Sequence, residues 1–305
     1  MKAKISIKFI LLLFIMFLNI LSAKKMDTKE LELIQQKNYK VNIGQNLKVK
    51  TDLGDIIIKS WDKNEVEIQI YGNKNAESKM EFSFNQNENT VEVIGEKEGG
   101  KIFGWFNKIE LKYEIKVPKK FNLDLKTSGG DMMAKVVEGN FEFKTSGGDI
   151  FIENSKGKIN ATTSGGDVVV NEFTGNTKTE TSGGDIEITK TFGNVYAATS
   201  GGDVVIKSSE GEIEAKTSGG DISLDYSGKD ADISLSTSGG DIDVNIPSNL
   251  NANAEIKTSG GRIYNNFQNI NNSTITKSKI EGNFNKGGKK LVCRTSGGDI
   301  RITQK

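Results

Sequence analysis

Eight copies of the pentapeptide Thr-Ser-Gly-Gly-Asp place carboxylates at regular intervals along this chain of 305 residues. The first six copies follow one another every 18 residues, and the later gaps are 20, 21 and 37 residues when a variant ending in Arg262 is counted. The aspartates of the eight copies are Asp131, Asp149, Asp167, Asp185, Asp203, Asp221, Asp241 and Asp299. Such a series suits three kinds of chemistry: calcium ligation, glycoside cleavage by paired carboxylates, and hydrogen bonding to turn amides.

Calcium ligation and turn capping make different demands on the repeat. Calcium-binding β-rolls repeat Gly-Gly-x-Gly-x-Asp, whereas here the second Gly-x-Asp step is missing and the period is doubled. Calcium takes six to eight oxygen ligands, for which one carboxylate per repeat is a thin supply. We therefore favour structural turn capping and keep calcium as the weaker hypothesis. The calcium candidates are Asp131, Asp149, Asp167, Asp185, Asp203, Asp221 and Asp241.

Catalysis has little support in the composition. The chain has no histidine, which removes the usual general base, the common zinc ligand and any Ser-His or Cys-His pair. A glycoside hydrolase needs an irregular cluster of acids with basic or aromatic neighbours, whereas the aspartate series is monotonous. Cys293 is the single cysteine, so no intramolecular disulfide forms, and we predict a small buried strand residue. We predict no catalytic residue and no cofactor.

The spacing of the repeat indicates which elements position these residues. After each aspartate, apolar residues alternate with polar ones, as at Ile186 and Ile188, and a turn leads to a second alternating run, as at Val195 and Ala197. A short fixed period is typical of a solenoid, whose coils bury their apolar faces only by stacking. The sequence predicts an all-β, single-chain β-solenoid (β-helix) with coils of about 18 residues, two strands per coil and an N-terminal β cap.

The two glycines of each phrase lie at a predicted corner between strands. We expect them to supply positive φ angles, which a side chain would oppose. By the alternation of the strands, the preceding threonine points inward and the serine outward. The predicted corner glycines are Gly129, Gly130, Gly147, Gly148, Gly165, Gly166, Gly183, Gly184, Gly201, Gly202, Gly219 and Gly220.

Residues 1–23 have the features of a secretory signal peptide. Lys2, Lys4 and Lys8 precede a nearly pure apolar run over residues 9–21, and a small residue follows at Ala23. An uncleaved anchor is the alternative, although the run is shorter than the roughly 20 residues that span a bilayer. We expect an exported chain that is periplasmic, cell-surface or secreted, with no transmembrane segment after signal removal.

Changes of pattern divide the remaining chain into four parts. Residues 24–40 form a polar lead-in with a weak helical pattern. Residues 41–126 are an N-terminal β region that supplies a cap and the first coils, with a degraded copy of the phrase near Gly54. Residues 127–261 are the regular array, and residues 262–305 form irregular C-terminal coils or a cap.

Phe103, Trp105 and Phe106 form an aromatic cluster between two predicted strands. One interpretation is a plug that covers the open end of the solenoid, where apolar core would otherwise meet water. The other is a tip that contacts a partner or a membrane. The sequence leaves both open.

The charge of the chain argues against a nucleic-acid partner. The 41 basic and 40 acidic residues give a net charge of +1, and removing the signal with its three lysines leaves about −2. Nucleic-acid binding proteins carry a net basic surface. We expect a partner of another class, an envelope or extracellular protein or a glycan.

Several features together resemble a known family. They are the Gly54-Asp55-Ile56 start followed by Trp61-Asp62, the alternating strand from Tyr113 to Pro118, the phrase array, and a hairpin over residues 282–288. Across roughly residues 40–305 the chain is similar to the bacterial putative-adhesin family, exported proteins with a domain of unknown function and recurring Ser-Gly-Asp-Ile turns. The resemblance implies an all-β solenoid at the cell envelope with an adhesive or scaffolding role, and it brings no established active site.

The favoured hypothesis is an exported, non-enzymatic β-solenoid with an adhesin-like or scaffolding role at the cell envelope. One alternative is a carbohydrate-active enzyme built on a β-helix. Another is an envelope-stress accessory protein that binds a membrane partner through the aromatic cluster. Polysaccharide turnover would favour the first alternative, and loss of membrane association on substitution of Trp105 would favour the second.

Overall fold

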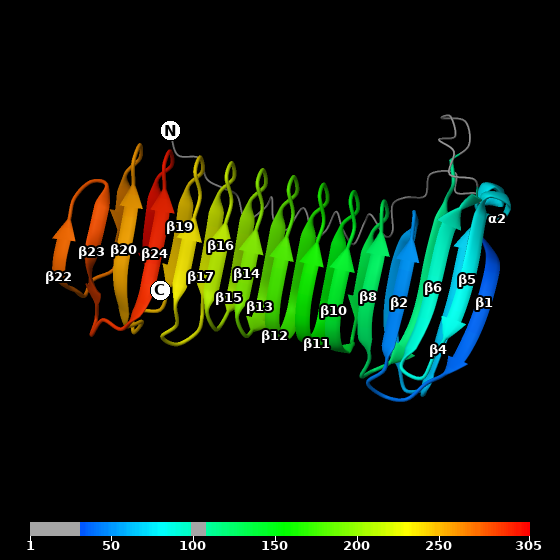
Figure 1. The fold of residues 1–305 in the computed structure, drawn as a ribbon. Helices are drawn as coiled ribbons and strands as arrows, with labels where there is room; N and C mark the ends of the chain where they lie inside the picture. The colour runs from blue at the N-terminus through cyan, green and yellow to red at the C-terminus, as the bar shows by residue number, and fades with distance from the viewer. Residues whose placement is uncertain (1–30, 99–107) are drawn as a thin grey trace.

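A computed structural model describes residues 31–98 and 108–305, and these residues form an elongated row of strands. Twenty-five strands of this part of the chain join into one open sheet, and its one labelled helix is the short α2 (Lys74–Lys79). Most strands lie side by side along the row, with the antiparallel strands at its ends (Figure 1). Among the described residues no helix is long and apolar enough to span a bilayer. The all-β prediction is confirmed.

The strand pairings form two ladders, which we call ladder I and ladder II. Ladder I runs in spatial order through β1 (Glu32–Lys40), β4 (Glu65–Gly72), β7 (Leu111–Pro118), β3 (Asp55–Trp61), β9 (Met132–Lys135), β11 (Ile150–Thr162), β12 (Val168–Glu180), β13 (Ile186–Phe192), β15 (Val204–Ser209), β17 (Ile222–Tyr226), β19 (Ile242–Ile246), β25 (Ile300–Gln304) and β21 (Ile263–Asn265). The long strands β11 and β12 bend and contribute to both ladders.

Ladder II carries the second strand of each repeat. In spatial order it runs through β5 (Met80–Gln86), β6 (Thr90–Lys97), β2 (Asn46–Thr51), β8 (Asn122–Thr127), β10 (Glu138–Lys144), β11, β12, β14 (Val195–Ala198), β16 (Ile213–Lys216), β18 (Ile233–Ser236), β24 (Lys289–Thr295), β20 (Ala252–Thr258), β23 (Lys279–Phe284) and β22 (Ile270–Ile275). Both ladders are parallel through the repeat array. Ladder II has antiparallel pairs at both ends, whereas ladder I has them only at its N-terminal end.

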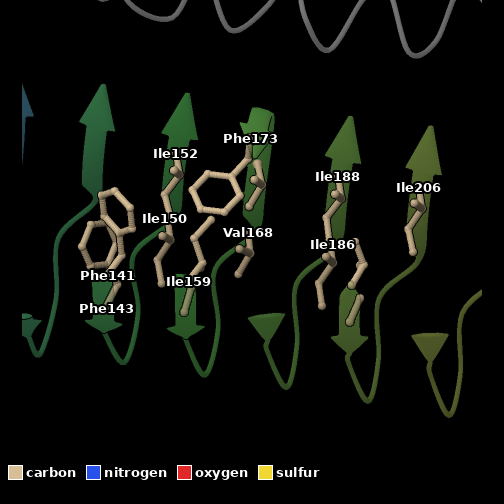
Figure 2. Packing of buried hydrophobic residues seen from close by; sticks show 14 of the residues in the cluster. Phe141, Phe143, Ile150, Ile152, Ile159, Val168, Phe173, Ile186, Ile188 and Ile206 are labelled. Carbon is tan, nitrogen blue, oxygen red and sulfur yellow. The ribbon is translucent and has the colours of Figure 1, made fainter. Parts of the chain in front are cut away.

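The register of the array brings equivalent residues of the repeat into contact. Ile150 lies beside Val168, and Val168 beside Ile186, each pair being 18 positions apart. The inward residues of both ladders therefore stack in rows, as Figure 2 shows for the first-strand residues Ile150, Val168 and Ile186. These side chains are 0% exposed, because alternate residues of a strand point to opposite faces and one face is closed by the other ladder. The fold is β-solenoid-like.

Aromatic side chains fill the core on the N-terminal side of the array. Phe141 packs edge-to-face against Phe143 and against Phe173, with ring centroids 6.0 Å apart in each case (Figure 2). Further along, the second strand carries small inward residues such as Ala197 and Ala215, which are also fully buried. The interior is thus filled by side chains along its length.

The order of strands in space departs from the order in the chain at both ends. In ladder II, β24 lies between β18 and β20, although it follows β20 in sequence, and β25 lies in the same way between β19 and β21. At the other end β2 and β3 lie between strands that come later in the chain. Strands β24 and β25 thus supply both strands of a coil that is inserted between two coils formed earlier in the chain.

The helical pattern expected before residue 40 is replaced by a strand. Residues from Glu32 onward form β1, which pairs antiparallel with β4, and Ile34 packs against the core. The edge of β4 offers unpaired backbone groups, and this pairing outweighs a weak local helix preference. Cys293 lies fully buried in β24, where burial raises the pKa of its thiol to about 12, which confirms the prediction of a buried strand residue.

A column of left-handed residues marks the bend between the two strands of a repeat. The four residues share one position of the repeat, and none is glycine. They are Val136 (φ 61°), Asn154 (φ 48°), Glu172 (φ 54°) and Lys190 (φ 54°). Asparagine tolerates this conformation, whereas a β-branched valine opposes it.

Candidate functional site

The aspartates of the repeated phrase form one continuous column. The backbone N–H of each donates to the Oδ1 atom of the aspartate in the neighbouring coil, at 2.7–3.0 Å. The column begins at Asp55, and its last carboxylate, Asp299, accepts the N–H of Arg262 at 2.8 Å. These amide donors offset the repulsion between stacked carboxylates, which is about 0.9 kcal/mol per pair in water at the ordinary strand spacing.

The threonines of the phrase connect each corner to its neighbour. Thr163 is representative: its Oγ1 donates to the carbonyl of Gly148 at 2.9 Å and accepts the N–H of Gly166 at 3.3 Å. Threonines of the phrase are buried, at 2–7% exposure, while the serines beside them are exposed. The predicted inward threonine and outward serine are confirmed.

The corner glycines are needed for a different reason from the one predicted. Among the twelve predicted corner glycines, only Gly130 has φ in the left-handed region (153°), so the expectation of positive φ at both is wrong. The second glycine instead lies against the backbone of the neighbouring coil: a Cβ on Gly166 would lie 2.1 Å from the carbonyl oxygen of Gly148. A Cβ on the first glycine, Gly165, would meet nothing closer than 3.7 Å. The close stacking of neighbouring coils therefore explains why the second residue of each pair is glycine, and it does not explain the first.

Two features modify the charge of the aspartate column. Burial raises the pKa of Asp149, and the carboxylates of Asp131 and Asp167 raise it further, against a hydrogen bond from the Asp167 amide. Near the C-terminal end, the Arg301 guanidinium reaches Asp241 at 2.9 Å, with two further aspartates within 3.5 Å. Over residues 31–98 and 108–305, no three Asp, Glu or Cys side chains gather closely enough to hold a metal ion. Calcium binding by the column stays a prediction.

The outer face of ladder II carries a groove that crosses ten neighbouring strands, from β6 to β24. Two adjoining hollows of about 740 and 560 Å³ make up the groove, and both are lined by Lys158 and Lys178. Nine of these strands contribute two outward residues, one to each wall, with a buried core residue such as Phe141 between them, and β6 contributes Thr90 alone. At the ordinary strand spacing, ten strands correspond to a groove of about 43 Å.

One wall of the groove is rich in asparagine. Asn46, Asn122, Asn140, Asn176 and Asn194 occupy it, with Lys158 in the same row. Near its N-terminal end neighbouring asparagines are hydrogen-bonded to one another. The side-chain Nδ2 of Asn122 donates to Asn46 Oδ1 at 3.1 Å, and the backbone N–H of Asn140 donates to Asn122 Oδ1 at 2.9 Å. This row was not predicted from the sequence, although Asn122, Asn140, Asn176 and Asn194 recur at multiples of 18 residues.

The opposite wall is charged, and its charges are paired. Glu142 accepts hydrogen bonds from Lys144 at 2.9 Å and from the Asn160 amide at 2.7 Å. Burial tends to raise the pKa of Glu142, but these two bonds outweigh it, so the pKa lies below its usual value. Tyr196 lies between Lys178 and Lys216, each ammonium being 5.7 Å from the ring centroid. The groove therefore offers hydrogen-bonding groups with little net charge.

Comparison with known proteins places this geometry in a family. A family model described as Toastrack DUF4097 matches residues 44–303. The chain belongs to the Toastrack DUF4097 family. The resemblance drawn from the repeat phrase is thus confirmed at the level of the family. No curated protein matches this Toastrack chain.

Several solved structures are similar to this Toastrack chain at low sequence identity. A putative adhesin from Parabacteroides merdae is 14% identical, with 88% of this chain and 95% of that chain covered and a TM-score of 0.40. A putative adhesin from Bacteroides fragilis is 16% identical, with coverage of 90% and 98% and a TM-score of 0.35. A putative lipid binding protein from Parabacteroides distasonis is 16% identical, with coverage of 88% and 96% and a TM-score of 0.34.

The other predicted site residues of this Toastrack chain fall in two groups. Phe103, Trp105 and Phe106, the predicted partner contacts, lie outside the described residues, as does the signal segment 1–23. The seven calcium candidates, by contrast, all lie in the aspartate column. This column precedes the strands of ladder I, at the corners. The groove of ladder II brings together a separate set of residues.

Proposed function

We propose that this protein is an exported, non-enzymatic β-solenoid with an adhesin-like role at the cell envelope, and that the groove of ladder II is its binding surface. In this proposal the solenoid consists of coils of about 18 residues with two strands each, closed by an N-terminal β cap. Its partner is an envelope or extracellular molecule. Membership of the Toastrack family supports the architecture, and the apolar run before Ala23 supports export.

The observation that carries this proposal is the groove itself. The interior of the array is filled by buried side chains, so recognition falls to the outer faces. On ladder II that face is hollowed along ten strands and lined with amides and charged groups. A long, open groove suits an extended partner, whereas small-molecule sites are enclosed and mostly apolar.

The charge pattern supports binding rather than turnover. A glycosidase needs one carboxyl group kept protonated as the acid and a second as base or nucleophile. In the groove, Glu142 is held below its usual pKa, and Asp124 is paired with Lys126 at 3.1 Å. A carboxyl group with a lowered pKa, such as Glu142, stays ionised at neutral pH and does not suit the role of the acid, and Asp124 is engaged in its ion pair, so we infer a non-catalytic surface.

Two measurements test the proposal. Export predicts that the mature chain begins at Lys24, which mass spectrometry of the protein from the expressing cells would establish, and a retained residue 1 would contradict it. Adhesion predicts that labelled full-length protein binds to intact cells or envelope fractions, and that a Lys158→Glu/Lys178→Glu variant binds far less. Asn171→Glu, on the outer face of ladder I, is the control, and equal loss in both variants would refute the role of the groove.

A further inference from the structure

Three neighbouring side chains at the centre of the groove carry polar groups with no partner within the described residues. They are the side-chain amide of Asn140 on β10, the ammonium of Lys158 on β11 and the Nδ2 group of Asn176 on β12, whose Oδ1 accepts the backbone N–H of Asn194. All three residues are exposed, and they follow one another in one wall where the two hollows join. Elsewhere in the same wall, Asn46, Asn122 and Asn194 are bonded to their neighbours.

We propose that this segment binds an uncharged, linear polysaccharide that lies along the groove across the strands. This inference rests on the proposed adhesin-like function and names the class of its ligand. The unpartnered amides and ammonium offer hydrogen-bond donors, and the Asn140 amide also offers an acceptor. Sugar hydroxyls both donate and accept hydrogen bonds, so they match this row of donors and acceptors. The groups of the row recur along the groove at the strand spacing of about 4.8 Å.

The balance of charge in the groove favours an uncharged ligand. Four lysines and five carboxylates line the two hollows together with six asparagines. Most of these charges are already paired, as in Lys48 with Glu92 at 2.8 Å and Lys178 with Glu180 at 3.0 Å. An acidic or basic polymer would have to compete with these internal pairs, whereas hydroxyl groups need only the unpartnered donors and acceptors.

Position on the sheet argues against a peptide. An extended peptide is bound mainly through backbone hydrogen bonds at an exposed sheet edge. The groove lies on the face of ladder II, where the strands on either side already pair with one another, as β10 does with β8 and β11. Binding on this face must therefore use side chains, which a hydroxyl-rich chain can satisfy without any backbone pairing.

The test measures binding of the full-length protein to soluble polysaccharides by titration calorimetry. The probes are laminarin, dextran and galactomannan as uncharged polymers, and polygalacturonate as an acidic one. We expect at least one uncharged polymer to bind, with an affinity that changes little between 50 and 500 mM salt. Each single variant Asn140→Ala, Lys158→Ala and Asn176→Ala should weaken binding roughly 3- to 10-fold, and the triple variant about 30- to 1000-fold.

Controls separate this inference from the proposed function. Asn171 lies on the same strand β12 but on the outer face of ladder I, so the Asn171→Ala variant should bind the polysaccharide with unchanged affinity. Binding of polygalacturonate alone, with steep salt dependence, or no binding to any polymer, would overturn the inference. Neither result removes the adhesin-like role, because cell binding is measured separately with the Lys158→Glu/Lys178→Glu variant.

Discussion

The two glycines of a corner should respond very differently to the same substitution. Adding a methyl group at Gly166 places it 2.1 Å from the carbonyl oxygen and 2.4 Å from the carbonyl carbon of Gly148. These are backbone atoms of the next coil, so no side-chain rotation relieves the overlap. At Gly165 the nearest atoms lie at 3.7 and 4.0 Å, which is ordinary contact. We predict that Gly166→Ala is strongly destabilising and that Gly165→Ala is nearly neutral.

The magnitude follows from the bonds that the displaced coil would lose. To relieve the overlap, the Cβ atom and the neighbouring backbone must move apart by about 1 Å, and a close-packed interior resists such a displacement. Three hydrogen bonds cross between the coils at this corner: Gly165 N–H to Ser146 O at 3.0 Å, Thr163 Oγ1 to Gly148 O at 2.9 Å, and Asp167 N–H to Asp149 Oδ1 at 2.8 Å. At about 1 kcal/mol net for each bond, Gly166→Ala should cost about 3 kcal/mol.

Urea denaturation followed by circular dichroism would measure the two variants side by side. A long repeat array can unfold in more than one step, so fluorescence and hydrogen exchange should be compared with circular dichroism before a free energy is assigned. Gly165→Ala should stay within about 0.5 kcal/mol of the wild type. Equal costs at both positions would refute close stacking as the cause, since a shared need for positive φ predicts equality.

Three further substitutions test other parts of the structure. Val136→Asn should stabilise the protein by about 1 kcal/mol in urea denaturation, because it relieves a left-handed β-branched residue, while Thr174→Asn at ordinary φ should give no gain. The raised folded pKa of Asp149 means that its ionisation opposes folding, so Asp149→Asn should be at least as stable as the wild type at pH 7. That advantage should vanish near pH 3, where the wild-type group is protonated, and an advantage that grew at low pH would contradict the sign. Arg301→Gln should lower stability by roughly 1 kcal/mol at low salt and by less in 1 M NaCl, since its carboxylate partners are partly exposed and screened.

The regular part of the fold could be predicted because each rule acts locally. Alternation alone assigns Ile186 and Ile188 to the core and the residues between them to the surface, and the fixed period then stacks equivalent residues. Burial of the inner residues in both strands agrees with that assignment. The same logic places Thr163 inward, and it also accounts for Asp167 lying in a column, since residues at one position of a repeat become neighbours.

The ends could not be predicted from the same rules, because strand order there depends on contacts distant in sequence. The phrase at Thr295 lies beside the one at Thr237, with its aspartate paired to one 58 positions earlier, and the intervening coil stacks outside it. No local pattern distinguishes insertion from simple continuation. For the same reason residues 32–40 form a strand: the deciding partner, β4, is supplied by tertiary structure.

The contrast between the aspartate column and the asparagine wall indicates where function can reside in a repetitive molecule. In the column, each carboxylate accepts a hydrogen bond from the backbone N–H of the neighbouring aspartate, so the repeated aspartate serves to hold the stacked coils together. In the wall, the row is interrupted at Lys158, and the side-chain amide of Asn140, the Lys158 ammonium and the Asn176 Nδ2 group lack partners within the described residues. A group whose hydrogen bonds are already satisfied gains little by binding another molecule, whereas an unsatisfied, exposed one gains without losing an internal bond. The most regular feature of the sequence is therefore structural, and the binding surface that we propose lies where the repeat is broken.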